Sequence, residues 1–123
     1  MPRLLRALRG AVVITEDTPE EVASKVEALL REAFARNDVA TEDLVSIFFT
    51  ATEDVRSAFP AQVARERLGL ADVPLLCARE MNVEGALPRV IRMLVHFYTE
   101  KERQEVQHVY VGPATALRPD LAV

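Results

Sequence analysis

The feature that most constrains this chain is a long segment that is apolar on one helical face only. Thr18 is a good N-cap, Pro19 suits the first helical position, and Glu21 follows three residues after the cap. Apolar residues then recur at helical spacing: Val22, Val26, Leu29, Leu30, Ala33 and Phe34. A helix over residues 19–36 with one apolar face has to cover another layer, so the sequence predicts a helix packed on a sheet.

Several other segments have the composition of strands. Residues 44–51 form an unbroken apolar run, which predicts a central strand covered on both sides. Residues 60–69 predict a short helix that Pro60 opens and Gly69 closes. The further strands are expected over residues 3–14, with Gly10 as a candidate bulge, over residues 73–77 as a buried strand, over residues 89–98, at His108–Val111 and as an extended segment in the tail.

The strand over residues 89–98 has two unequal faces, because alternate side chains point to opposite sides of a sheet. One face is wholly apolar and consists of Ile91, Met93, Val95 and Phe97; the other consists of Val90, Arg92, Leu94 and His96. Together these elements predict an α+β fold with a mostly antiparallel or mixed sheet. The long helix covers one sheet face only, so we expect a second subunit to cover the other.

Length and charge limit the class of protein. The chain has 123 residues, which suits a single domain over residues 1–123, and its net charge of -4 argues against nucleic-acid binding. No apolar run approaches the roughly 20 residues of a membrane span. The first ten residues are too charged for a secretory signal. We therefore expect a soluble, cytoplasmic protein with no membrane partner.

Arg92 is the strongest functional signal, because a guanidinium stays charged and its strand neighbours are apolar. Burying it without a partner is costly, so it has to meet a carboxylate. The plain alternative is a structural ion pair with Glu80. Arg9, Arg65, Cys77 and Tyr110 are further candidates, although singly each also fits a surface or core position. Several arginines with a tyrosine and one carboxylate predict a pocket for a small anionic metabolite.

Other chemistries fit poorly. Neither His96 nor His108 lies in a Ser-His-Asp arrangement, and Cys77, the one cysteine, has no base partner for nucleophilic attack. The sequence has no glycine-rich phosphate loop with a lysine, and no His/Cys/Asp spacing for a metal. We expect no metal or cofactor.

Read as a whole, the chain resembles the AroH-type chorismate mutases, which are small trimeric enzymes distinct from the all-helical type. The resemblance rests on SAFPAQVARE, VPLLCAREM, NVEGALPRVIR, HVYV and ALRPDL, in this order along the chain. It implies a mixed five-stranded sheet with a long helix, assembled as a trimer that resembles an α/β barrel. It also implies conversion of chorismate to prephenate, without a cofactor, in clefts between adjacent subunits.

The resemblance assigns roles to the candidate residues. Arg92 would donate to the ether oxygen, Glu80 would accept from the ring hydroxyl with Cys77 beside it, and Arg9 and Tyr110 would hold the side-chain carboxylate. The residues matching the rest of the pocket are Phe59, Ala61, Arg65, Leu75, Leu76, Leu117 and Arg118, of which Phe59, Ala61 and Arg65 match a segment that the neighbouring subunit supplies.

Two positions depart from some relatives, which have a basic residue in place of Gln62 and a threonine in place of Leu76. Arg79 is set aside, because a strand points it away from the side of Glu80. The alternative from another class is a trimeric regulatory protein that binds a small anion on a similar fold without turnover. A carboxylate facing the ligand argues against that alternative, because it would repel an anion.

Overall fold

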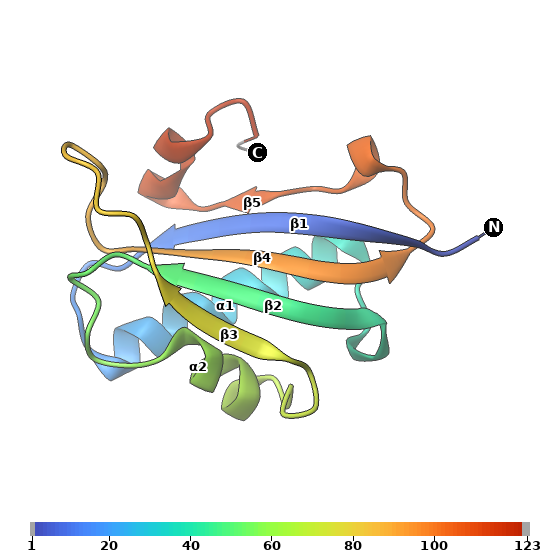
Figure 1. Cartoon of the computed structure of the whole chain (residues 1–123), viewed down its shortest axis with the longest axis horizontal. Helices are drawn as coiled ribbons and strands as arrows, with labels where there is room; N and C mark the ends of the chain where they lie inside the picture. Colours follow the sequence, from blue (N-terminus) through green and yellow to red (C-terminus); the bar gives the residue numbers. More distant parts are fainter. Residues whose placement is uncertain (1, 122–123) are drawn as a thin grey trace.

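The computed structural model describes residues 2–121, which form one mixed sheet with helices beside it (Figure 1). The sheet has five strands in the order β3-β2-β4-β1-β5. The strands are β1 (Leu4–Val13), β2 (Leu44–Ala51), β3 (Leu75–Arg79), β4 (Val90–Thr99) and β5 (Val109–Tyr110), and the two α-helices are α1 (Pro19–Asn37) and α2 (Pro60–Arg67). The predicted α+β class, the mixed five-stranded sheet and both helices are confirmed.

The strand directions follow from the connections. The centre of the sheet is antiparallel, since β4 pairs antiparallel with both β1 and β2. Both edges are parallel, since β3 pairs with β2 and β5 pairs with β1 in the same direction. The connection from β2 to β3 contains α2, as a parallel crossover usually contains a helix.

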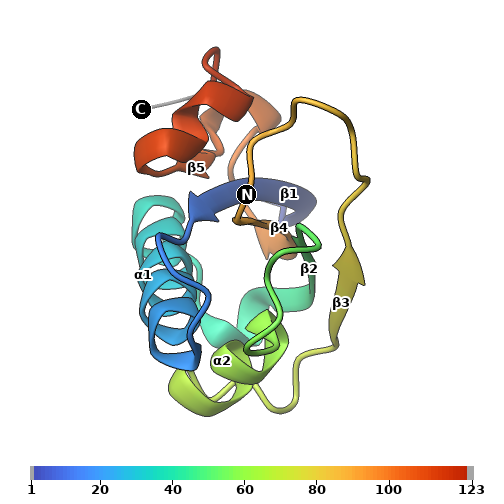
Figure 2. The ribbon, with the colours of Figure 1, turned by 90° about the vertical axis from the view of Figure 1, so that its left-hand side faces the viewer.

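Helix α1 begins and packs as the sequence predicts. The Thr18 side chain accepts a hydrogen bond from the Glu21 N–H at 3.1 Å, and Asp38 ends the helix in the left-handed conformation. Figure 2 shows α1 on one side of the sheet, and the residues that it buries include Val22, Val26 and Leu30. They meet the side chains of Leu8, Val12, Ile47, Phe49, Ile91, Met93, Val95 and Phe97, all at most 3% exposed, and we call this side of the sheet the covered face.

The opposite side, the open face, carries no helix over most of its area (Figure 1). Five large apolar side chains remain between 37% and 57% exposed there: Leu5, Phe48, Leu76, Leu94 and Tyr98. The register makes them neighbours, because Leu5 lies opposite Tyr98 and Phe48 lies between Leu76 and Leu94. The prediction that residues 44–51 are covered on both sides is therefore wrong within one chain.

Three further predictions are wrong. The strand expected over residues 73–77 begins two residues later, because Pro74 has no N–H for pairing, and it is a half-exposed edge strand. Gly10 makes no bulge against β4; a Cβ there would lie 2.6 Å from Met93 Cε, so glycine permits close packing. The tail forms a 3-10 helix, Gly112–Leu117, with Pro113 in its first turn, where an extended segment was expected.

Candidate active site

Arg92 and Glu80 meet on the open face. The Arg92 Nε lies 3.4 Å from Glu80 Oε1, and the same oxygen accepts a hydrogen bond from the Thr50 hydroxyl at 2.7 Å. Strand pairing creates this contact, because Thr50 lies opposite Arg92 and the Glu80 N–H donates to the Ala51 carbonyl. The Thr50 bond fixes the direction of the carboxylate, so the guanidinium faces a defined negative charge.

Arg92 keeps hydrogen-bonding capacity for another molecule. Its Nε is buried and makes no hydrogen bond within the described residues, although the side chain as a whole is 40% exposed. The contact with Glu80 is an ion pair without hydrogen-bond geometry, so an anionic ligand on this face would supply acceptors to the part of the Arg92 side chain that stays exposed.

Tyr110 and Arg9 lie on the same face as Arg92. Tyr110 is aligned with Ala11, and Ala11 is aligned with Arg92, so the small alanine separates the tyrosine from the arginine. Tyr110 is 6% exposed and packs with Ala11, Val90 and Ala114. Arg9 lies two residues before Ala11, with an exposed side chain. This places two guanidinium groups, a phenol and one carboxylate around a shared part of the open face.

The tail approaches this group. Leu117 packs beside the cluster that contains Tyr110, and the Arg118 side chain forms two hydrogen bonds with Asp120, at 3.0 and 2.7 Å. The bond to Arg118 lowers the pKa of the Asp120 carboxyl, and the charge of Arg9 adds to this effect. Arg118 is thus held by a carboxylate from its own tail.

Cys77 does not join Arg92 and Glu80 within one chain. Its side chain packs at the edge of the main core on the covered face, with Leu75 and Ala61. Its sulfur accepts a hydrogen bond from the Ala61 N–H at 3.4 Å. Burial raises the pKa of the Cys77 thiol, although the Ala61 N–H opposes the shift. A neutral thiol is a poor nucleophile, so the environment of Cys77 gives no support to covalent chemistry.

The remaining predicted residues divide between the two sides. Phe59 precedes α2 and is 69% exposed, and Arg65 is exposed on α2. Leu76 lies on the open face beside Phe48. The structure therefore gathers Arg9, Glu80, Arg92, Tyr110, Leu117 and Arg118 into one group, and Phe59, Ala61, Leu75 and Cys77 into another around the start of α2.

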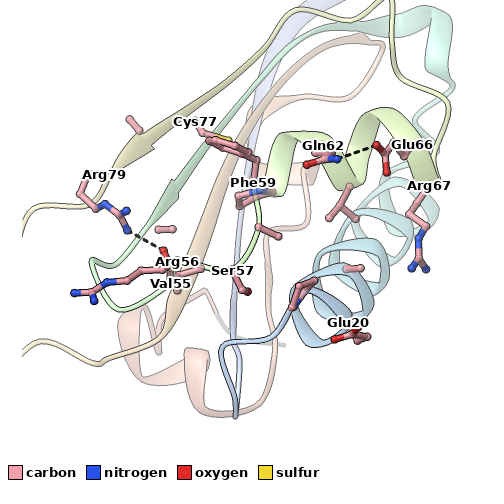
Figure 3. Close-up of a pocket in the computed structure, with 17 residues that line it drawn as sticks. Glu20, Val55, Arg56, Ser57, Phe59, Gln62, Glu66, Arg67, Cys77 and Arg79 are labelled. Carbon is pink, nitrogen blue, oxygen red and sulfur yellow. Dashed lines mark hydrogen bonds between the residues drawn. The ribbon is translucent and has the colours of Figure 1, made fainter.

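A pocket of about 830 Å³ lies beside this second group, between the start of α1, the loop before α2, α2 itself and β3 (Figure 3). Phe59 and Cys77 line it, but neither Arg92 nor Glu80 does. Arg79 also lines it and donates to the Val55 carbonyl at 3.1 Å (Figure 3), which confirms that it points away from Glu80. The pocket within a single chain therefore lies apart from the charged group around Arg92 and Glu80.

Sequence reasoning missed two residues of the charged group. Thr50 orients Glu80, and His108 accepts a hydrogen bond from the Arg9 N–H through Nδ1 at 2.9 Å. Thr50 is one of two polar residues in an otherwise apolar strand, with Ser46, which was a usable signal, but its partner depends on strand register. Within residues 2–121 no group of His, Cys, Asp and Glu side chains is placed to hold a metal ion. No helix in this part of the chain has the length and apolar character needed to cross a bilayer.

Comparisons with known proteins identify the family of this chain. The family model of chorismate mutase type I matches residues 5–121. The chain belongs to the type I chorismate mutase family. It is 45% identical to the chorismate mutase AroH of Thermus thermophilus over 119 residues, which cover 96% of this chain and 97% of that protein. It is 36% identical to the chorismate mutase AroH of Bacillus subtilis over 120 residues, covering 98% and 94% respectively.

A solved structure shows that the relationship extends to the fold. The chorismate mutase of Clostridium thermocellum superposes with a TM-score of 0.87 at 35% sequence identity, covering 89% of this chain and 97% of that one. The resemblance stated from the sequence motifs is therefore confirmed. None of these findings supports the alternative of a regulatory anion binder without turnover.

Proposed function

We propose that this type I chorismate mutase converts chorismate to prephenate by an intramolecular [3,3] rearrangement at the site around Arg92. The observation that carries the proposal is the pairing of Arg92 with Glu80 on a face that also presents Arg9 and Tyr110. A dianionic substrate explains the cations, and a reaction with charge separation explains the carboxylate among them.

The chemistry assigns a role to each member of the pair. In the chair-like transition state the ether C–O bond breaks ahead of C–C bond formation, so negative charge grows on the ether oxygen and positive charge on the ring. Arg92 donates to that oxygen, and Glu80 faces the ring and accepts from its hydroxyl. Losing one such aimed donor costs about 3–4 kcal/mol of transition-state stabilisation. The protein need not transfer a proton or form a covalent bond.

Positioning of the substrate supplies the rest of the rate acceleration. Arg9 and Tyr110 bind the carboxylate of the enolpyruvyl side chain and hold it over the ring, with Leu117 and Arg118 closing the site from the tail. Fixing two reacting ends in a near-attack geometry removes entropy from the barrier.

We further propose a homotrimer with the active site between subunits and a barrel-like arrangement of the three sheets. The apolar side chains of the open face support this assembly, because exposed neighbours such as Phe48, Leu76 and Leu94 indicate an interaction surface. The second group, with Phe59, Ala61, Leu75 and Cys77, together with Arg65 of α2, would then complete the neighbour's charged group. On this arrangement Cys77 reaches the substrate from the adjacent subunit.

The two departures have local consequences in the proposed site. Gln62 is neutral, so it brings no positive charge toward a substrate, and its amide bonds to Glu66 on its own helix at 2.9 Å. Leu76 offers no side-chain polar contact, so any hydrogen bond from that position comes from the backbone.

We place the enzyme in the cytoplasm, where its substrate is a soluble metabolite.

The direct test follows chorismate absorbance with the purified protein and identifies prephenate as the product. We expect rapid conversion by the wild type and a loss of about 10²–10³-fold or more in kcat for Arg92→Ala. Arg36→Ala is the matched control, because Arg36 is an α1 surface arginine paired with Glu32, and its activity should stay at the wild-type level. Arg92→Ala with normal turnover would remove Arg92 from the mechanism, and a wild type that binds chorismate without converting it would refute the proposed function.

A further inference from the structure

The attachment of β5 to β1 uses a side chain where a strand normally uses its backbone. Strand β5 has only two residues, Val109 and Tyr110, aligned with Gly10 and Ala11. One step earlier His108 comes level with Arg9, and the Arg9 N–H donates to His108 Nδ1 at 2.9 Å. The imidazole therefore continues the strand pairing by one residue, at the backbone of a substrate-binding arginine.

Gln107, the residue before His108, explains why the Arg9 N–H has no backbone acceptor at this point. The buried Asn37 side chain, at the end of α1, donates to the Gln107 carbonyl at 2.8 Å and accepts from the Gln107 N–H at 2.7 Å. Both backbone groups of Gln107 are thus committed to α1. The Arg9 N–H has the His108 nitrogen as its acceptor.

This bond requires one protonation state. A backbone N–H can only donate, so Nδ1 has to be the unprotonated nitrogen of a neutral imidazole. Protonation of Nδ1 would set two donors against each other and break the contact. Since β5 carries Tyr110 and β1 carries Arg9, the loss would loosen both groups proposed to bind the side-chain carboxylate.

We propose that His108 is a positioning residue for substrate binding, whose neutral imidazole fixes the backbone of Arg9 against β5 and whose protonation releases it. The expected effect on turnover rests on the proposed function, whereas the hydrogen bond between the Arg9 N–H and His108 does not.

The surroundings of His108 favour the neutral form. Burial lowers the pKa of the imidazole, and the charges of Arg9 on β1 and Arg118 in the tail lower it further. The Asp120 carboxylate is paired with Arg118, and Asn37 of α1 is uncharged. The contact should therefore hold at neutral pH and fail only below the ordinary histidine pKa of about 6.5.

The test compares His108→Asn with His108→Ala in steady-state chorismate kinetics from about pH 5 to about pH 8. The Asn Oδ1 can replace Nδ1 as an acceptor but does not titrate, so this variant should lose the acid decline in kcat/KM that the wild type shows. His108→Ala should have a KM that does not change with pH and lies roughly five- to tenfold above the wild-type value at neutral pH, the size expected for one lost hydrogen bond, with kcat nearly unchanged. His96→Asn, at the other histidine, is the control and should keep the wild-type acid decline.

Exchange of the Arg9 amide hydrogen gives a readout that needs no turnover. At neutral pH the Arg9 amide should be protected in the wild type and in His108→Asn, and should exchange at least about fivefold faster in His108→Ala. Equal protection in all three proteins, or an acid decline and KM that neither substitution moves, would overturn the inference. A wild type without chorismate turnover would refute the proposed function instead, and amide exchange would still decide the role of His108.

Discussion

The two faces of the sheet are built from the same strands, yet they differ in completeness. On the covered face, neighbours such as Ile91, Met93 and Val95 are at most 3% exposed, because α1 closes over them. Arg92 and Leu94 alternate with them and point to the open face. The Arg92 side chain is 40% exposed there, and Leu94 is 37% exposed. A face completed within the chain stabilises the fold, whereas the face left incomplete carries the charges and is the one on which we propose that substrate and a second subunit bind. Four substitutions test this comparison, from the largest expected effect to the smallest.

Arg92→Lys should separate charge from geometry on the open face. Lysine keeps the positive charge but has neither the planar fork nor an Nε beside Glu80. We expect kcat to fall about 10²–10³-fold, as for loss of one aimed donor, with little change in thermal stability. Chorismate turnover and a melting curve measure both. Retention of most of the activity would mean that charge alone is sufficient at this position.

Met93→Ala, one residue along the same strand, should have the opposite character. Met93 is 3% exposed on the covered face, and truncating a buried methionine costs about 3 kcal/mol of unfolding free energy. Denaturant unfolding should show this loss, while kcat per folded molecule stays near the wild-type value. A large fall in kcat without a loss of stability would show that the covered face contributes to catalysis and not only to stability.

Phe48→Ser should weaken association and spare the fold of the subunit. Phe48 is 41% exposed between Leu76 and Leu94, and burying a phenylalanine is worth about 1.5–3 kcal/mol. Sedimentation at decreasing protein concentration should show subunits separating earlier than in the wild type, with unchanged circular dichroism. An unchanged oligomer would place the subunit contact elsewhere.

Thr18→Ala should have the smallest effect, since it removes only the cap of the helix that covers the sheet. The Thr18 side chain accepts from the Glu21 N–H, and loss of such a cap costs about 1 kcal/mol of unfolding free energy. Thr18→Ser keeps the hydroxyl and should restore stability. Equal stability of all three proteins in denaturant would show that the cap contributes nothing measurable.

Local patterns were sufficient for part of the fold. Thr18 and Pro19 located the start of α1, and alternation identified Ile91, Met93, Val95 and Phe97 as one buried face, because a cap and a strand period depend only on neighbours in the chain. Gly10 was misread because a glycine in a strand fits either a bulge or a close contact, and the contact is with Met93, far along the sequence. The tail was misread although Gly112-Pro113 is a reasonable helix start.

The sequence by itself determined both helices, the long strands, the family motifs and the requirement that Arg92 find a carboxylate. Only the tertiary structure decided which groups meet. Register places Thr50 between Arg92 and Glu80, packing turns Cys77 toward α2 on the other face, and the commitment of Gln107 to Asn37 leaves the Arg9 N–H to His108. The reason is physical: periodicity fixes which side a residue points to, but a hydrogen bond between residues about a hundred positions apart depends on how the strands align.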